Sequence, residues 1–399
     1  MINVSFTRRF DNITALTQCL RKTHGQDDTD LRTLATTIEQ DYFTTCTSAE
    51  DYQHKCDQAV QSYSEGNANT ADEAIEAPQD VYVDVIFNTE ATPIGHYIHP
   101  TFHADGRTST VYKAKCALTE DTRPPSELIV ALKITYPDRL EPPHNSRREA
   151  RLLTQARHEY VVPLLDTFGQ PGGIYVLVFP FARLDLENLL RTDTLEKHQV
   201  KLVFSGLFNA LAHIHSLGII HRDVKPSNIL LKSTSGPVYL IDFGIAWSPR
   251  DTDSEPGDKK ITDIGTTCYR PPEVLFGCRS YGSSVDMWAA GCIVVEMLRQ
   301  GHHQLFNAGP LGSELGLIKS IFMTLGTPTD ATWSNSEYLP DWGKVRFQQF
   351  PAQRWNVILP GVSTAVSNFA RQTISFNWKQ RLTAEDALRH QLALEIGVG

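Results

Sequence analysis

The sequence predicts an α+β fold of two lobes, one small and built on an antiparallel sheet, the other larger and mostly helical, with an N-terminal extension. From residue 97 onward, β-branched and aromatic residues alternate and turn residues interrupt them, which is typical of an antiparallel sheet. Residues 195–217 carry apolar side chains at helical spacing instead. With 399 residues, 41% of them hydrophobic, the chain is long enough for both lobes and the extension.

The negative charge is concentrated near the N-terminus. Residues 1–80 hold six Lys/Arg and fourteen Asp/Glu, a net charge of −8, whereas the whole chain carries −9. The rest is therefore close to neutral. Nucleic acid binding depends on clustered positive charge, so we expect no nucleic-acid partner.

Cysteine usage and hydropathy indicate the compartment. The seven cysteines form no C-x-x-C pair and show no metal-ligand spacing with histidine, which favours reduced thiols. The opening residues 1–5 lack the pattern of a signal peptide, and the most apolar run, at 287–295, is too short to span a bilayer. We expect a soluble chain of the nucleus, the cytoplasm or both, with no membrane partner.

The most informative stretch, residues 221–228, reads His-Arg-Asp-Val-Lys-Pro-Ser-Asn. An aspartate and an asparagine five residues apart on one loop can lie on either side of a phosphoryl group. Asp223 would accept the proton of an attacking hydroxyl, Lys225 would neutralise charge on the transferred group, and Asn228 would ligate Mg²⁺. Magnesium needs hard oxygen ligands, which an amide has and a lysine lacks.

In this stretch the chain resembles the eukaryotic protein kinases, whose catalytic loop reads H-R-D-x-K-x-x-N. A lone His-Arg-Asp triplet would be a solvated turn, but here eight residues are in register after an apolar helix. The resemblance implies a bilobal protein kinase fold, with an N-terminal lobe at 94–182 and a C-terminal lobe at 183–395. It also implies ATP and Mg²⁺ as cofactors and a protein substrate.

The extension, residues 1–80, contains three thin apolar stripes at helical spacing, within 13–20, 31–42 and 52–63. A small docking module is one interpretation of them. We favour an acidic, weakly helical or disordered extension, because thin stripes bury little surface without a partner.

Residues 104–111 lie where these kinases carry G-x-G-x-x-G-x-V, whose glycines let backbone N–H groups close over phosphates. Only Gly106 remains of the three glycines. The side chains of Ala104 and Ser109 should stiffen the loop and hold it slightly further from the nucleotide.

Two segments match the ion pair of the family's small lobe. Residues 130–133 correspond to the strand that ends in the phosphate-binding lysine, and residues 148–153 to the helix whose glutamate pairs with it. A lysine within a strand is more often a solvated edge residue. The sixteen-residue interval and the intervening proline-rich turn favour a pair between Lys133 and Glu149.

Residues 174–179 form a continuous apolar run that predicts a buried strand, and residues 180–186 after it resemble the hinge of cyclin-dependent kinases. By that resemblance Phe179 lies behind the adenine, the Ala182 backbone faces the base, and Asp185 meets the ribose. Pro180 replaces the usual acidic residue, although its carbonyl can still accept a hydrogen bond from the adenine amine. The nucleotide-binding residues implied by the resemblance are Ala104, Gly106, Val111, Ala131, Lys133, Phe179, Phe181, Ala182, Asp185 and Leu230.

A helix is predicted at 195–217, with Gly218 as its stop, and the catalytic loop follows directly after it. Beyond the loop, Asp242 in Ile-Asp-Phe-Gly would bridge Mg²⁺ to the β and γ phosphates, and Gly244 permits the backbone turn that aims it. A chain with all these polar residues is poorly described as a pseudokinase. The loss of two loop glycines keeps that alternative open.

The activation segment runs from residue 242 to residue 273. Thr266 lies where Ser/Thr kinases keep a threonine that bonds the catalytic aspartate and lysine, which favours serine or threonine substrates. The resemblance further implies that Glu273 pairs with Arg381 and that Asp286 anchors the backbone of the catalytic loop.

Residues 269–275, 321–328 and 381–388 resemble the cyclin-dependent kinase branch. In that branch a cyclin presses on the glutamate-bearing helix, and three arginines grip a phosphothreonine. Two of these arginine positions hold Arg148 and Arg222 here.

The third arginine position holds Trp247, which lacks the paired, charged N–H donors with which arginine binds phosphate. The phosphoacceptor position holds Ile261, with Thr262 next to it. Asp263 and the two arginines would then order the segment without modification. The approach to the helix, residues 143–149, also lacks the apolar residue that faces cyclin.

This combination is similar to the monomeric fungal cyclin-dependent-kinase-activating kinases. It implies a monomer that phosphorylates the activation-segment threonine of another cyclin-dependent kinase, with no clear need for a cyclin. Two alternatives stay open: an ordinary cyclin-dependent kinase that needs its cyclin, and a pseudokinase scaffold. A requirement for proline after the acceptor residue is also open.

Overall fold

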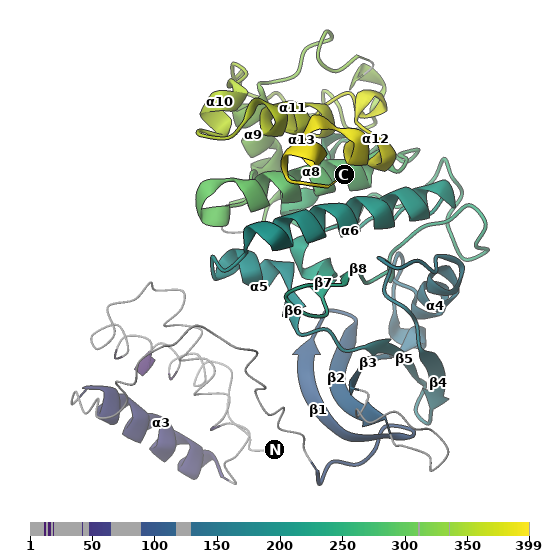
Figure 1. The fold of residues 1–399 in the computed structure, drawn as a ribbon, viewed down its shortest axis with the longest axis vertical. Helices are drawn as coiled ribbons and strands as arrows, with labels where there is room; N and C mark the ends of the chain where they lie inside the picture. The colour runs from purple at the N-terminus through teal and green to yellow at the C-terminus, as the bar shows by residue number, and fades with distance from the viewer. Residues whose placement is uncertain are drawn as a thin grey trace. The chain divides into compact units, whose positions relative to one another are not determined.

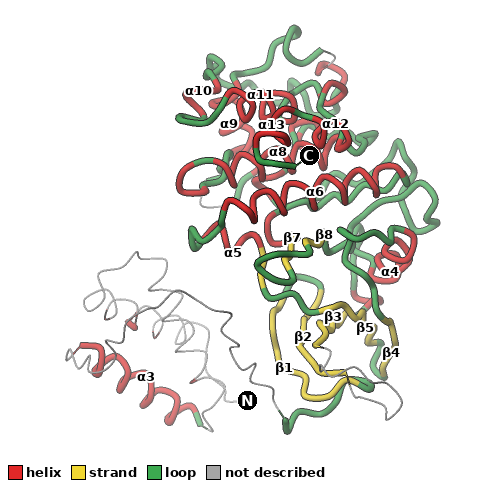
Figure 2. Tube along the Cα trace, viewed as in Figure 1, coloured by secondary structure: helices red, strands yellow, loops and turns green. Residues whose placement is uncertain are grey.

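The computed structural model describes residues 48–64, 89–116, 129–309, 312–334 and 336–398, with the single positions 12, 15, 16, 19 and 42. The chain divides into two units, residues 1–84 and 85–399. Within the second unit, Figure 1 shows a curved sheet with one helix beside it and a larger body of helices. Figure 2 shows the same division by secondary structure. The predicted fold class is therefore confirmed.

Helix α3 (Ala49–Ser64) is the element described in the first unit. It covers the third predicted stripe, and its Tyr52 and Cys56 side chains are buried. Asn12 donates hydrogen bonds of 3.3 Å to the Tyr52 hydroxyl and to Gln53 Oε1. The other two stripes lie almost entirely outside the described residues.

The smaller lobe is an antiparallel sheet in the order β1-β2-β3-β5-β4. Val130 and Leu132 are buried on one face of β3, in the core of this lobe. Because side chains alternate along a strand, Ala131 and Lys133 point to the opposite face, toward the cavity between the lobes. The strands are β1 (Tyr97–Asp105), β2 (Ser109–Cys116), β3 (Ile129–Thr135), β4 (Asp166–Gln170) and β5 (Ile174–Pro180).

Helix α4 (Ser146–Gln155) lies beside the sheet (Figure 1). Its N-cap, Asn145, accepts a hydrogen bond of 2.8 Å from the Arg148 N–H, which satisfies one free donor at the helix end. The Asn145 N–H in turn donates to the Gly244 carbonyl at 2.9 Å. The start of the helix is thus bonded to the start of the activation segment.

The larger lobe is built around helix α8, whose residues 285–297 are all buried. A small sheet, β6-β7-β8, lies beside the helices at the junction of the lobes (Figure 1). The elements are β6 (Leu184–Asp185), α5 (Leu186–Arg191), α6 (Lys197–Ser216), β7 (Ile229–Leu231), β8 (Val238–Leu240), α7 (Pro272–Leu275), α8 (Ser284–Leu298), α9 (Glu314–Leu325), α10 (Trp355–Ile358), α11 (Thr364–Thr373), α12 (Ala384–Arg389) and α13 (Gln391–Glu395).

Helix α6 is slightly shorter than predicted, and its ends explain why. Glu196 and Gln199 form a reciprocal capping box, so the helix begins after Glu196. At the other end Gly218 takes a φ of +77°, which glycine adopts without strain. The prediction of a long helix that ends at this glycine is confirmed.

The end of the activation segment is held by a buried ion pair. Arg381 donates to the two carboxylate oxygens of Glu273 at 2.6 and 2.7 Å, and both side chains are fully buried. Arg381 also donates to the Ser284 carbonyl at 2.9 Å, at the first turn of α8. The pair therefore joins three separate segments of the larger lobe.

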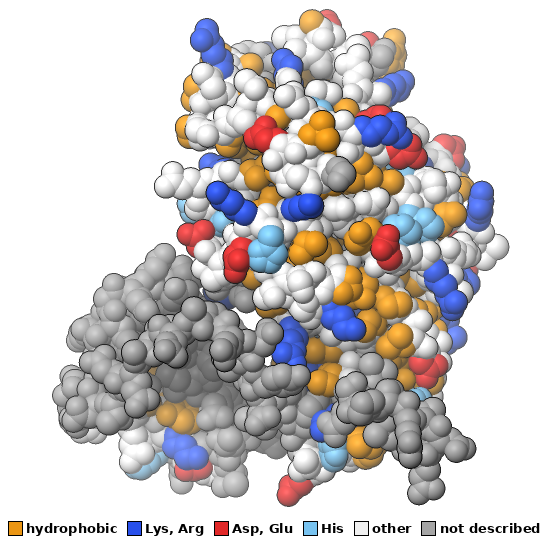
Figure 3. Space-filling model, viewed as in Figure 1, with side chains coloured by type: hydrophobic (Ala, Val, Ile, Leu, Met, Phe, Trp, Pro, Cys, Tyr) orange, Lys and Arg blue, Asp and Glu red, His pale blue; other side chains and the backbone are white. Residues whose placement is uncertain are grey.

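The charged surface is mixed. Figure 3 shows Lys and Arg interspersed with Asp and Glu over the larger lobe, with no broad patch of one sign on the described part of this face. Among the described residues, no helix combines the length and apolarity needed to cross a bilayer.

Replacing Glu273 by Gln should destabilise the second unit, residues 85–399, by about 3 kcal/mol, because removing one partner leaves a buried, uncompensated charge on Arg381. Urea unfolding followed by circular dichroism measures this. The control is Lys344→Met, which removes the exposed Lys344–Asp341 pair and should cost less than about 1 kcal/mol. Equal effects of the two substitutions would contradict the assigned role of the buried pair.

Candidate active site

A lysine shared by two carboxylates lies between the lobes. Lys133 on β3 donates to both oxygens of Glu149 on α4, at 2.8 and 2.9 Å, and to Asp242 Oδ1 at 2.7 Å. Glu149 is buried, whereas 40% of the Asp242 side chain is exposed. The expected ion pair and one expected metal ligand therefore meet at a single ammonium group.

These charges set one another's protonation. Partial burial opposes the charge of Asp242, but the adjacent Lys133 ammonium outweighs this and lowers the pKa of the Asp242 carboxyl well below its ordinary value. Burial also opposes the charge of Lys133, yet the two carboxylates more than offset it and raise the pKa of the ammonium. Both groups are therefore ionised at neutral pH.

Three polar side chains hold Asp223. Lys225 Nζ lies 2.8 Å from Oδ2, and the Thr266 hydroxyl donates to Oδ1 at 3.0 Å. Asn228 Nδ2 donates to the Asp223 carbonyl at 2.8 Å and to Oδ2 at 3.2 Å. The carboxylate is thus oriented at the mouth of the cleft, which Lys225 and Thr266 also line. Such a group can accept a proton from a hydroxyl.

Hydrogen bonds to Asp286 on α8 hold the backbone of the catalytic loop in place. The buried carboxylate accepts the N–H groups of His221 and Arg222, both at 2.9 Å, and contacts His215 Nε2 at 2.9 Å. Arg222 has a φ of +71°, which strains any residue other than glycine. The bonds to Asp286 hold this conformation and so direct the next residue, Asp223.

A cavity of about 290 Å³ separates the lobes at the hinge. Of the residues that the resemblance assigns to the nucleotide, only Gly106 does not line it. Asp185 also caps α5, since its Oδ1 accepts the Asn188 N–H at 2.7 Å. The lining includes Ala104, Val111, Ala131, Lys133, Phe179, Phe181, Ala182, Asp185, Asn228, Leu230 and Asp242.

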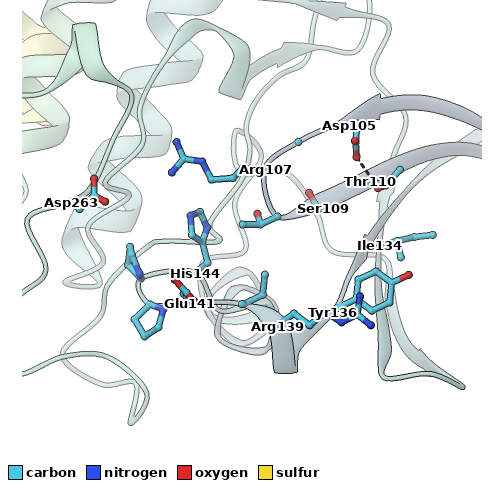
Figure 4. A pocket seen from close by; sticks show the side chains of 15 residues that line it. Asp105, Arg107, Ser109, Thr110, Ile134, Tyr136, Arg139, Glu141, His144 and Asp263 are labelled. Carbon is cyan, nitrogen blue, oxygen red and sulfur yellow. Dashed lines mark hydrogen bonds between the residues drawn. The ribbon is translucent and has the colours of Figure 1, made fainter. Parts of the chain in front are cut away.

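The loop between β1 and β2 forms a tight turn. The Gly106 N–H donates to the Ser109 carbonyl at 2.8 Å, and the Thr110 hydroxyl donates to Asp105 Oδ1 at 2.8 Å. Gly106 therefore lies at the turn, outside the adenine cavity. Figure 4 shows the neighbouring cavity, of about 490 Å³, with Arg107 extending from this turn on the side of Asp263.

Arg107 and His144 are two lining residues that the sequence did not point out. Both line the cleft mouth together with Asp223 and Asp242. Arg107 is exposed and has no ion-pair partner within the part of the chain that the structure describes. An arginine at this position belongs to no general motif, so only its place in the fold reveals it.

The oxygen atoms of this site fit Mg²⁺ and a triphosphate. Asn228 uses its amide nitrogen inside the loop, and its Oδ1 accepts no hydrogen bond from the described residues. Asp242 Oδ2 likewise accepts no hydrogen bond from the described residues, since both bonds of this carboxylate go to Oδ1. Two hard oxygens beside an ammonium are the groups that a magnesium-bound phosphate chain needs. A Cβ on Gly244 would stand 3.1 Å from Asp242 Oδ1, so glycine leaves this carboxylate room.

The family model of the protein kinase domain matches residues 105–393. This chain belongs to the protein kinase family. It is an ATP-dependent serine/threonine kinase, as predicted.

Three curated relatives resemble the kinase. Serine/threonine-protein kinase csk1 of Schizosaccharomyces pombe is 35% identical over 243 residues, which cover 59% of this chain and 77% of the relative. Cyclin-dependent kinase 7 of Xenopus laevis is 34% identical over 294 residues, 72% of this chain and 78% of the relative. Cyclin-dependent kinase 20 of Danio rerio is 34% identical over 292 residues, 72% and 80% respectively. The predicted resemblance to the cyclin-dependent kinase branch is confirmed.

One expectation for the activation segment is wrong. Asp263, expected near the two arginines, pairs with Arg270 at 2.9 Å. Arg222 pairs with Glu255 at 3.1 Å instead, and Arg148 donates to two main-chain carbonyls. Nothing in the sequence distinguishes these acids, because the segment has no periodicity and its path decides which one meets the arginine.

Replacing Asp242 by Asn should reduce phosphate transfer roughly a hundredfold or more, because Lys133 loses a partner and the site a charged oxygen ligand. A radiolabelled transfer assay on a generic basic protein measures this, with thermal melting to confirm folding. Asp223→Asn should have a similar effect. Transfer that persists in both folded variants would contradict the assigned roles.

Proposed function

We propose that this kinase transfers the γ-phosphate of ATP to the activation-segment threonine of another cyclin-dependent kinase, as a monomer without a cyclin. Its glycine-poor loop, Trp247 and residues 260–264 support the resemblance to monomeric fungal activating kinases. Its similarity to a fungal serine/threonine kinase is consistent with this. The observation that carries the proposal is the ion pair between Arg222 and Glu255, a residue of the activation segment itself. In the cyclin-dependent kinase branch a phosphothreonine contacts this arginine instead.

The outward face of α4 supports independence from a cyclin. Its exposed residues are Arg147, Arg151, Thr154 and Gln155, all polar. The buried core of a partner interface is on average more apolar than the rest of the surface, and these four exposed residues offer no apolar side chain for one. Arg151 is also committed, because it pairs with Asp251 at 2.8 Å.

The side chains around Asp223 account for the chemistry. An incoming serine or threonine hydroxyl would give its proton to Asp223 while Lys225 balances charge on the transferred group. Lys133 would contact the phosphates. Asn228 and Asp242 would hold Mg²⁺, which neutralises phosphate charge when bound.

Gly265 and Arg270 lie in the activation segment beside Thr266 and are compatible with a proline-directed pocket, but a requirement for proline after the acceptor residue stays an open alternative. Gly265 has a φ of +71°, and its carbonyl accepts a hydrogen bond of 3.0 Å from Arg270 Nε. A carbonyl oxygen has two lone pairs, so this bond alone does not decide whether a proline must follow the acceptor residue.

The second candidate is an ordinary cyclin-dependent kinase, which the two cyclin-dependent relatives favour. The two candidate functions differ in whether the chain alone, with no cyclin bound, can transfer phosphate.

The purified, phosphatase-treated chain should phosphorylate a kinase-dead cyclin-dependent kinase with no cyclin present. The substrate's activation-segment threonine should carry the label, so its alanine variant serves as the control. An Asp223→Asn enzyme gives the background. A chain that stays inert until a cyclin is added would establish the second candidate.

Replacing Thr262 by Ala should leave most of the activity intact, because Glu255 already occupies the arginine and no phosphate is needed. Initial rates on the same substrate measure this. A loss of tenfold or more, about 1.4 kcal/mol of barrier, would mean that Thr262 must be modified.

A further inference from the structure

Residues 251–255, the acidic segment, carry carboxylates at every second position: Asp251, Asp253 and Glu255. The segment follows Trp247 in the first half of the activation segment. Its three acids contact two different elements, the catalytic loop and helix α4. No motif marks these residues, and the known chemistry of the site does not use them.

Glu255 meets the catalytic loop. Its carboxylate accepts hydrogen bonds from Arg222 at 3.1 to 3.4 Å, and its Oε1 also accepts the Ile261 N–H at 3.3 Å. The Arg222 side chain is fully buried, and that of Glu255 is 16% exposed. Burial opposes the charge of Glu255, but Arg222 outweighs it and lowers the pKa of the carboxyl. One ionised group thus joins the residue before Asp223 to the backbone of the activation segment.

Trp247 completes this contact without adding charge. Its indole N–H donates to the Glu255 carbonyl at 2.8 Å, and Lys260 lies over its ring at 4.4 Å. A phosphate carries a charge of about −1.5 to −2, so several arginines are needed to balance it. A carboxylate carries −1, and Arg222 alone balances that. The tryptophan at the third arginine position therefore suits a carboxylate.

Asp251 and Asp253 meet helix α4. Arg151 donates to Asp251 at 2.8 and 3.0 Å and to Asp253 at 2.6 Å. The Asp253 carbonyl accepts from Arg148 at 3.2 Å. Because Arg148 and Arg151 flank Glu149 on the same helix, these bonds hold the helix that presents Glu149 to Lys133.

We propose that Asp251, Asp253 and Glu255 are positioning residues that replace both the phosphothreonine and the cyclin contact of the cyclin-dependent kinase branch. Glu255 acts on Asp223 through Arg222. The two aspartates act on Glu149 through Arg151. The inference needs only the kinase activity, and it stands whether or not the substrate is another cyclin-dependent kinase.

The first test compares Glu255→Gln, Glu255→Asp and Asp258→Asn in the full chain. Asp258 is a matched control, since it is an exposed acid three residues away. On a generic basic protein, Glu255→Gln should lower kcat roughly tenfold or more, about 1.4 kcal/mol, with little change in KM for ATP. Glu255→Asp should recover part of the loss, and Asp258→Asn should match the wild type. A Glu255→Gln enzyme that melts as the wild type does and keeps kcat within twofold would refute the proposal.

The second test concerns α4. Arg151→Met should raise KM for ATP and lower kcat, because Glu149 is then held less firmly against Lys133. Arg147→Met is the matched control, on the same helix and exposed, over the Tyr175 ring at 5.6 Å, and should change neither value. Equal kinetics for the two variants would remove the assigned role of the aspartates.

A third measurement needs no variant. Wild-type chain shown by mass spectrometry to carry no phosphate should have the same kcat as untreated chain. A phosphate-dependent kcat on the basic protein would overturn the inference. Full activity there with no labelling of a cyclin-dependent kinase would overturn only the proposed substrate.

Discussion

The rest of the structure depends on the ammonium of Lys133, which two carboxylates share. It belongs to the sheet of the smaller lobe, Glu149 belongs to α4, and Asp242 begins the activation segment. Removing either partner would leave a buried charge poorly compensated, which is costly. The three charged groups can meet only if α4 lies at the right distance from both the sheet and Asp242. Anything that moves α4 changes how well the ammonium meets the phosphates.

The arrangement of the apolar cores explains why ionic contacts, rather than apolar packing, position Glu149 and the reacting groups. The sheet has a small core of its own, whereas Leu152 and Leu153 of α4 belong to the large core that contains α6 and α8. Glu149 thus reaches across the boundary between two cores. Apolar packing is non-directional and cannot aim a carboxylate, so the polar contacts of Asp286, Glu255 and the Glu273–Arg381 pair position the reacting groups.

Much of this arrangement was predictable from the sequence, because motifs of fixed spacing place Asp223, Asn228 and Asp242 near one another. The helix ending at Gly218 follows from apolar periodicity and a glycine stop. The pairing of Glu255 with Arg222 was not predictable, because several acids in an irregular segment are equivalent in sequence. Gly106 lies at a turn outside the adenine cavity and lines the cleft mouth with Asp223 and Asp242, so its expected place over the phosphates stays a prediction. Side chains set by loop paths, such as Arg107, give no sequence signal.

A crystal structure of the unphosphorylated chain with a non-hydrolysable ATP analogue and Mg²⁺ tests the central claim most directly. The account predicts phosphates beside Lys133, a cation held by Asn228 and Asp242, and Glu255 still bonded to Arg222. A nucleotide bound away from these groups would contradict the account, as would an activation segment in which Glu255 has left the arginine.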